Sequence, residues 1–260
     1  MIVLGYALSL LVGITMGLIG AGGAILTVPI LVYLFGVGAA DATGYSLFIV
    51  SALSFVGAST YLRRGEVPVG PTVAFGVPSI MGVLAARAWV VPLMPKVMGT
   101  IAGVEVTKDR FLLLAFATLM VFGALAMIRK PSPTVVRDLV GWQFALMGTL
   151  VGFVTGMVGA GGGFLIIPAL VCFAGLEMKA AVGSSLSIIA VNAAIGFFAF
   201  IAKGGEANWL LLAGILLAAG VGLVFGLQFS KRVDGVRLKP VFGFFVLLIA
   251  GFIFFRELLF

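Results

Sequence analysis

The sequence contains no histidine and one cysteine, Cys172, and only 10% of its 260 residues are charged. A single cysteine excludes an internal disulfide framework, and the lack of His and Cys clusters argues against zinc or haem ligation. No acidic residue lies securely inside an apolar segment, which argues against general acid–base catalysis there. We therefore expect no enzyme activity, no cofactor and no metal site.

The chain is instead rich in apolar residues, which make up 62% of it, against roughly 45–50% in soluble domains. Stretches approaching the 17–25 or so residues that cross a bilayer's hydrocarbon core recur along the whole length. Polar loops near 96–110, 129–139 and 230–239 are too short to form a separate soluble domain. The sequence thus predicts an all-α, multi-pass protein of the cell (inner) membrane. The apolar segments are at about 2–20, 23–38, 42–62, 70–95 and 110–128, then 140–159, 163–175, 181–202, 207–229 and 240–256.

The N-terminus and the net charge support the same class. The sequence begins Met-Ile-Val-Leu-Gly and has neither the basic first region of a signal peptide nor a convincing cleavage site. We therefore expect a retained membrane segment and no signal peptide. The formal net charge is +7, and the basic residues are scattered over short loops. That distribution fits contact with anionic lipid headgroups better than nucleic-acid binding.

Residues 13–65 are similar to residues 152–204 and align with them without a gap, 139 positions further along the chain. The matched residues are mostly glycine, proline, alanine and serine, and glycines such as Gly36 and Gly175 stay in register. Such a duplicated apolar chain with Gly-interrupted segments is typical of membrane transporters built from repeats. We expect two transmembrane repeats, 1–130 and 131–260, in one membrane domain.

Loop charges favour repeats of inverted topology. If each half crosses the membrane an odd number of times, one side collects ten basic residues and the other five, which agrees with the positive-inside rule when both termini lie outside the cytoplasm. The number of basic residues on each side is the same whether segments 23–38 and 163–175 cross the membrane fully or form re-entrant hairpins, so the charges do not distinguish these two alternatives. The ten are Arg63, Arg64, Arg129, Lys130, Arg137, Lys179, Lys231, Arg232, Arg237 and Lys239; the five are Lys96, Lys108, Arg110, Lys203 and Arg256.

Each half carries a Gly-Ala-Gly-Gly run followed six residues later by a proline, Pro29 or Pro168. Because proline disrupts a helix interior, we favour a broken hairpin with an unwound tip and a short helix, which Thr27 could cap in the first half. Glycine permits left-handed backbone and close approach, and consecutive N–H groups at a helix start attract anions. We therefore predict that the two tips frame one anionic substrate. The residues assigned to it are Gly20, Gly22, Gly23, Gly159, Gly161 and Gly162.

Other glycines have a simpler explanation in helix packing. The pairs Gly13/Gly17 and Gly152/Gly156 are small-xxx-small patterns that let helices approach closely in lipid. A further glycine-rich face could pack within one subunit or between subunits, so a homo-oligomer is possible. That face contains Gly214, Gly220, Gly222 and Gly226.

Four further polar residues are candidates for substrate binding. Ser46 and Ser185 occupy matched positions at the start of the next helix in each half, where they either donate to the anion or back-bond their own helix. Asn192 is deeper in its segment and costly to bury alone, so we expect it to face a partner or a cavity. Arg87 lies within an apolar segment, where it either attracts the anion or is a structural residue that pairs with carbonyls or snorkels.

These doubled motifs resemble the TauE/SafE family, the sulfite exporters. The resemblance is carried by Gly20-Ala-Gly22-Gly23, Pro29 and Gly44-Tyr-Ser46-Leu47, and by their counterparts Gly159-Ala-Gly161-Gly162-Gly163, Pro168 and Gly183-Ser-Ser185-Leu186. It covers nearly the whole chain, although the first copy has Ala24 where the second has Gly163. The resemblance implies transport of sulfite, sulfonates, thiosulfate or related small anions.

We therefore expect a secondary transporter of small anions that works by alternating access around a site near the bilayer midplane. An anion-conducting channel on the same architecture is the alternative, and a non-transporting scaffold is a weaker one. The expected partners are a small anionic substrate and membrane lipids.

Overall fold

The computed structural model describes residues 2–20, 26–86, 97–101, 104–107, 141–158, 163–172, 174–202, 204–230 and 235–259, with isolated positions at 89, 93, 111, 114, 117, 118, 121, 122, 124, 125 and 128. These residues are almost all helical, which confirms the predicted fold class. One antiparallel hairpin, β1 (Val97–Ile101) and β2 (Val104–Thr107), lies in the predicted loop near 96–110. The helices are α1 (Ile2–Ile19), α2 (Thr27–Tyr33), α3 (Ala39–Arg63), α4 (Val69–Ala85), α7 (Gly141–Val158), α8 (Gly163–Cys172), α9 (Met178–Ala202), α10 (Trp209–Ser230) and α11 (Gly235–Leu259).

Helix bounds repeat at the spacing of the sequence duplication. Both ends of α7 lie 139 positions after those of α1, and the same is true of α9 and α3. The left-handed glycines repeat as well: Gly36 (φ 67°) and Gly175 (φ 63°) form one pair, and Gly65 (φ 69°) and Gly204 (φ 86°) form another. Glycines that are matched between the two halves of the sequence therefore adopt the same left-handed conformation in both halves.

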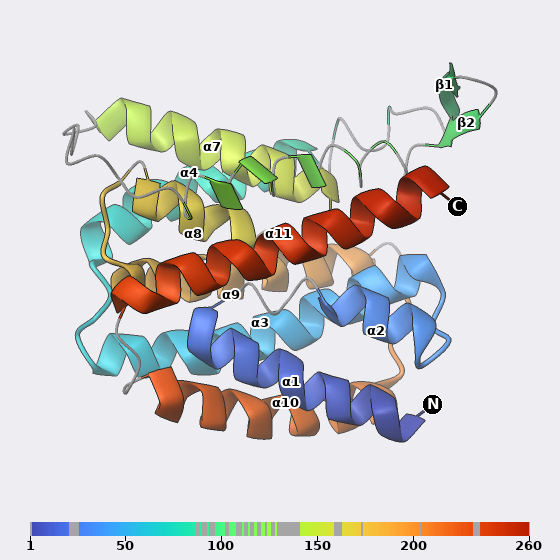
Figure 1. Cartoon of the computed structure of the whole chain (residues 1–260), viewed down its shortest axis with the longest axis horizontal. Helices are drawn as coiled ribbons and strands as arrows, with labels where there is room; N and C mark the ends of the chain where they lie inside the picture. The colour runs from blue at the N-terminus through green and yellow to red at the C-terminus, as the bar shows by residue number, and fades with distance from the viewer. Residues whose placement is uncertain are drawn as a thin grey trace.

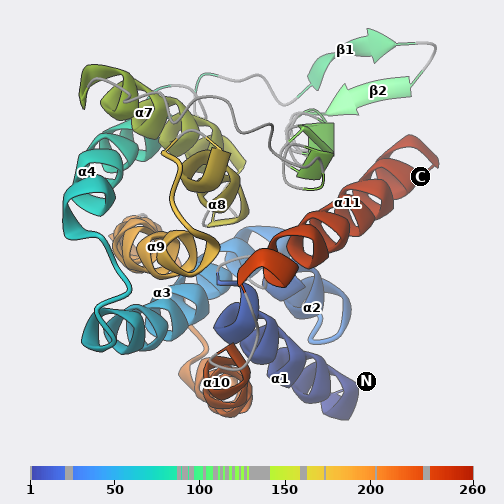
Figure 2. The same ribbon diagram turned by 60° about the vertical axis from the view of Figure 1, so that its left-hand side comes forward.

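The helices lie in three layers, with α3 and α9 in the middle, α1 and α10 on one side, and α4 and α7 on the other (Figures 1 and 2). The two central helices run antiparallel, because Gly44 near the start of α3 meets Phe200 near the end of α9, whereas Gly57 meets Leu186. At the crossing, the Ser51 hydroxyl donates to the carbonyl oxygen of Ala190 at 2.9 Å.

The outer layers are held by glycines that let two backbones touch. A side chain at Gly13 would collide with the carbonyl oxygen of Ala219 on α10, and one at Gly222 with that of Leu10 on α1. On the opposite side of the molecule, Gly152 of α7 meets the Ser79 carbonyl of α4 in the same way. The predicted role of these glycines in packing is therefore confirmed.

The predicted glycine face on α10 divides into packed and open positions. Gly222 and Gly226 meet the α1 backbone, and Gly214 meets the ring of Tyr6. A side chain at Gly220 would meet nothing within 4 Å. Three of the four predicted glycines thus pack inside this one chain.

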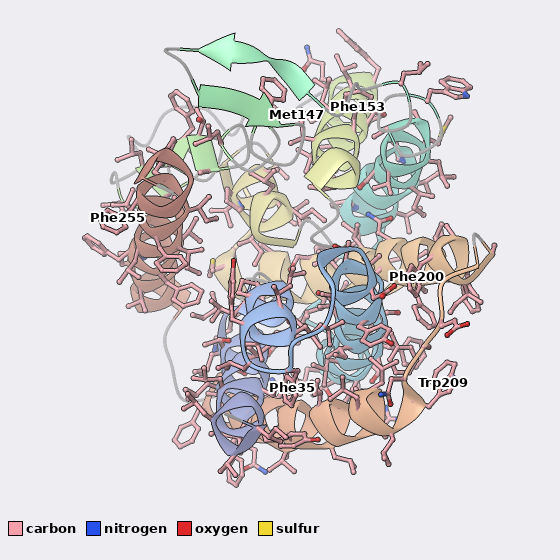
Figure 3. The ribbon with its side chains drawn as sticks, turned by 90° about the vertical axis from the view of Figure 1, so that its right-hand side faces the viewer. Phe35, Met147, Phe153, Phe200, Trp209 and Phe255 are labelled. Atoms are coloured by element: carbon pink, nitrogen blue, oxygen red, sulfur yellow. The ribbon has the colours of Figure 1, made fainter. Side chains whose placement is uncertain are left out.

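Within the described residues, four helices, α1, α3, α9 and α10, are long and apolar enough to cross a membrane, and α4, α7 and α11 contain shorter apolar stretches. Many large apolar side chains point outward; Phe255 on α11, for example, is 62% exposed and projects away from the other helices (Figure 3). A soluble protein rarely exposes such continuous apolar surface. The chain is therefore a multi-pass membrane protein.

The helices α2 and α8 lie within the predicted hairpin segments 23–38 and 163–175 and are short. With seven residues, α2 is about 10 Å long at roughly 1.5 Å per residue, a third of a hydrocarbon core of about 30 Å. Two local expectations were wrong. Thr27 does not cap α2, which follows Leu26 with no side-chain cap, and Pro168 lies inside α8, not at the helix break. Pro168 is tolerated although it leaves the Phe164 carbonyl without its usual helical donor.

Candidate functional site

The first glycine of the first tip ends α1. Gly20 is buried and has φ +78°, in the left-handed region where other residues are strained. The apolar helix therefore breaks where the sequence predicts. The other predicted tip residues, Gly22, Gly23, Gly159, Gly161 and Gly162, lie outside the described residues, as does Arg87.

Gly20 lies against a residue of the other half that the sequence also singles out. A Cβ atom at Gly20 would lie 3.3 Å from Ser185 Oγ on α9, 3.1 Å from Val182 Cγ1 and 3.3 Å from Ile167 Cδ1 on α8. The break at the end of α1 thus meets the first turns of α9. Two predicted site residues, 165 positions apart in the sequence, are brought into contact across the two halves.

The two matched serines are both fully enclosed, with Ser46 2% and Ser185 0% exposed. The Ser185 hydroxyl donates to the carbonyl oxygen of Val182 at 2.8 Å, which is the helix back-bond considered from the sequence. Its lone pairs remain available in this rotamer. A bound anion would require the hydroxyl to rotate away from Val182 and donate toward the ligand.

Ser46 and Ser185 lie on opposite sides of the α3–α9 crossing. Each serine precedes its crossing residue, Ser51 or Ala190, by five positions. Because the helices are antiparallel, the two serines are about 15 Å apart along the helix axes, at roughly 1.5 Å per residue. One small anion cannot contact both hydroxyls at once. The structure therefore separates a candidate half-site at Gly20 and Ser185 from Ser46, which lies on the other side of the crossing.

Asn192 follows Ser185 by two turns on the same face of α9. It is 5% exposed, and its amide Nδ2 donates to Ser79 Oγ of α4 at 3.1 Å. Its Oδ1 is buried with no hydrogen-bond partner among the described residues. At Ser184, the residue directly before Ser185, the hydroxyl accepts a hydrogen bond from the Thr72 hydroxyl of α4 at 2.7 Å. Asn192 therefore faces a partner, as expected, and keeps one free acceptor in the interior.

Sequence reasoning did not select Ser79 and Thr72, which supply the α4 side of these contacts. The available signal was their spacing, because hydroxyls seven positions apart in an apolar helix lie on one face. Nor did it predict that the Thr27 hydroxyl would be buried, with no hydrogen-bond partner in the part of the chain that the structure describes, at a cavity of ≈ 10 Å³ that Ser9 also lines. Such a cavity has room for about one water molecule.

The two ends of the central helix pair differ in charge among the described residues. The end where α3 finishes and α9 begins carries Arg63, Arg64 and Lys179, with Glu66 and Glu177; the other end carries Asp41 and Glu206. Arg64 donates to the Leu227 carbonyl near the end of α10 at 3.1 Å and lies 5.4 Å from the Tyr61 ring centre. A cation there also opposes the negative end of the α10 dipole.

Aromatic rings fill the end of the central helix pair that carries Asp41 and Glu206. The Tyr45 hydroxyl accepts the backbone N–H of Asn208 at 2.9 Å, and the Tyr45 ring meets Phe200 edge-on at 6.5 Å between centroids. Trp209 packs edge-on against both Phe48 and Phe197, and Figure 3 shows Phe200 and Trp209 at this end. Gly20 and Ser185 are thus buried in the fold, and charged residues and aromatic rings lie at the two ends of the central helix pair.

Comparison with known proteins supports a transport role for this fold. The family model of the sulfite exporter TauE/SafE matches residues 5–253. A probable membrane transporter protein of Xylella fastidiosa is 30% identical, over 95% of this chain and 92% of its own length. The probable membrane transporter proteins YdhB of Bacillus subtilis and MJ0441 of Methanocaldococcus jannaschii are 26% and 27% identical, over 88% and 75% of this chain and 90% and 71% of their own lengths. No solved structure matches the chain.

Proposed function

The chain belongs to the TauE/SafE sulfite exporter family and is a membrane transporter protein, and we propose that it carries small sulfur-containing anions across the cell membrane by alternating access. Sulfite, thiosulfate and small organosulfonates are the substrates we expect. The observation that carries this proposal is the contact between Gly20 and Ser185, where a buried left-handed glycine of one half lies beside a buried hydroxyl of the other.

The chemistry of this half-site suits an oxyanion. Neutral donors, such as a serine hydroxyl and backbone N–H groups, bind oxygen acceptors without placing a permanent countercharge in the membrane. A hydrogen bond to a charged group contributes about 1.5–3 kcal/mol, roughly twice that of a neutral pair. The remaining donors in this proposal are N–H groups of the tip, at Gly22 and Gly23, and the matching glycines of the second half.

The separation of the two serines suggests how the anion moves. With about 15 Å between Ser46 and Ser185 along the helix axes, we propose that the anion leaves one half-site before it binds the other. Ser185 lies toward the basic end and Ser46 toward the aromatic end. We assign the basic end, with Arg63, Arg64 and Lys179, to the cytoplasm by the positive-inside rule. Each half-site then serves one side of the membrane.

Counterflow in proteoliposomes tests this function. Vesicles loaded with unlabelled sulfite should accumulate labelled sulfite transiently, with a rate that saturates, whereas protein-free vesicles should not. A current that rises linearly with voltage, without saturation or counterflow, would indicate an anion channel. No flux of sulfite, thiosulfate or sulfoacetate in either assay would exclude the proposed substrate class.

A further inference from the structure

The helices pack as two bundles that do not coincide with the two halves of the sequence. The first bundle consists of α1, α2, α3 and α10, and the second of α7, α8, α9 and α4. Each bundle thus takes three helices from one half and its fourth from the other, as Figure 2 shows for α10 beside α1 and for α4 beside α7. Among the described elements, α3 against α9 is the extensive contact between the bundles.

Side-chain hydrogen bonds follow the same division. Within the first bundle, Arg64 bonds to the α10 backbone and Tyr45 accepts from the residue before α10. Within the second bundle, α4 and α9 are joined by the pair Thr72–Ser184 and by the bond from Asn192 to Ser79. Of the long-range side-chain bonds given for the described residues, only the bond from Ser51 to Ala190 joins the bundles, and it lies at the α3–α9 crossing. Each bundle is therefore braced internally by side-chain hydrogen bonds, whereas the long α3–α9 interface between the bundles has, among the described residues, a hydrogen bond of this kind at its crossing.

On each side of that hydrogen bond, an aromatic residue of one central helix packs on a glycine of the other. At the basic end, a Cβ atom at Gly183 of α9 would lie 2.9 Å from Tyr61 Cβ of α3. At the opposite end, one at Gly44 of α3 would lie 2.6 Å from the Phe200 ring of α9. The sequence duplication relates these two contacts, because Gly183 occupies the position of Gly44 in the second half and Phe200 occupies that of Tyr61. They are apolar and carry no hydrogen bond, so they can separate at little polar cost.

The two loops that connect the bundles each contain a left-handed glycine at the end of a helix. The chain passes from the first bundle to the second between α3 and α4, and returns between α9 and α10. Gly65 and Gly204 occupy the left-handed region in these loops, and side chains there would meet nothing within 4 Å. The N–H groups of Gly65 and Gly204 bond to the carbonyls of Leu62 and Ile201, so each glycine closes its helix. A few element-terminal residues of this kind can absorb a change in helix orientation.

We propose that the moving parts are these two bundles, which rock about the contact between Ser51 and Ala190. Rocking in one direction separates Tyr61 from Gly183 and opens the basic end, and rocking in the other separates Phe200 from Gly44. This inference rests on the proposed transport function, because it describes how each half-site opens to its own side. It differs from rocking of the two sequence halves, which would pull α4 away from α9 and α10 away from α3.

Disulfide cross-linking distinguishes the two motions, since Cys172→Ala removes the one native thiol. The pair Thr72→Cys and Ser184→Cys joins the two halves within one bundle, at hydroxyls already 2.7 Å apart. The pair Tyr61→Cys and Gly183→Cys joins the bundles. We expect the first disulfide to leave at least half of the sulfite flux, and the second to remove more than nine-tenths of it until a reductant restores it.

Reversible loss of flux with the Thr72–Ser184 link, or full flux with the Tyr61–Gly183 link, would overturn the proposal. Only variants that transport when reduced are scored, and Gly44→Cys with Phe200→Cys replaces the second pair if that variant does not fold. If the Cys172→Ala parent carries no anion, the proposed function fails first. Spin labels at the exposed Met81 of α4 and Leu217 of α10 then test the motion alone: two distance populations support rocking, and one invariant population excludes it.

Discussion

Ser51 donates a hydrogen bond to the carbonyl of Ala190, the residue that occupies its own position in the second half of the sequence. A residue meets its counterpart in this way only where it lies on the axis relating the two halves. Because α3 and α9 are antiparallel, that axis runs across the helices and not along them. The contact therefore marks the centre of the α3–α9 pair, with Ser46 on one side of it and Ser185 on the other.

We expect Ser51→Ala to lower the free energy of unfolding by about 0.5–1.5 kcal/mol, the usual net contribution of one hydrogen bond. Thermal unfolding of the protein in detergent measures this change. Ser59→Ala is the matched control on the same helix, because Ser59 bonds only to Val56 of its own helix. Equal melting temperatures for the two variants would contradict a stabilising contact at the crossing.

Two glycines on α10 should respond very differently to a large side chain. Gly222→Leu forces a side chain into the Leu10 carbonyl of α1, whereas Gly220→Leu points into open space. Overpacking of this kind costs about 1–3 kcal/mol or more, so Gly222→Leu should melt well below the wild type and Gly220→Leu close to it. If Gly222→Leu were as stable as Gly220→Leu, α1 and α10 would not be in backbone contact.

The bond between Asn192 and Ser79 predicts a non-additive pair of substitutions. Ser79→Ala leaves a buried amide without its acceptor and should cost about 1–3 kcal/mol, while Ser79→Ala combined with Asn192→Leu should recover much of that loss. Thermal unfolding of the single and double variants measures the coupling. Strictly additive losses would show that the two side chains do not interact.

Anion binding should also distinguish two serines of α9. Ser185→Ala removes the hydroxyl beside Gly20 and should weaken sulfite binding roughly tenfold or more, the equivalent of about 1.5–3 kcal/mol for a hydrogen bond to a charged group. Ser187→Ala should leave binding unchanged, because Ser187 back-bonds to Gly183 and is not at the half-site. Isothermal titration of both variants gives the comparison, and equal affinities would remove Ser185 from the site.

Local features were predictable from the sequence because they depend on residue type. The apolar segments gave the helices, Gly20 marked the break after α1, and matched glycines such as Gly65 and Gly204 marked left-handed turns. Helix partners were not predictable, because helices that are apolar on every side give no periodic signal for the face that packs. The pairing of α1 with α10, and the distance between Ser46 and Ser185, required the three-dimensional structure.

The central claim is that the backbone at Gly20, beside the Ser185 hydroxyl, binds the anion. Gly20→Ala and Gly36→Ala impose the same left-handed strain, of about 1–2 kcal/mol, but only the first places a methyl group at the half-site. A thermal-shift titration with sulfite, sulfate, thiosulfate, taurine and sulfoacetate tests the claim, since a ligand at a hundredfold excess over its Kd stabilises by about 2.7 kcal/mol. We predict a shift with sulfite for the wild type and Gly36→Ala that is lost in Gly20→Ala; an equal shift in all three would contradict the account.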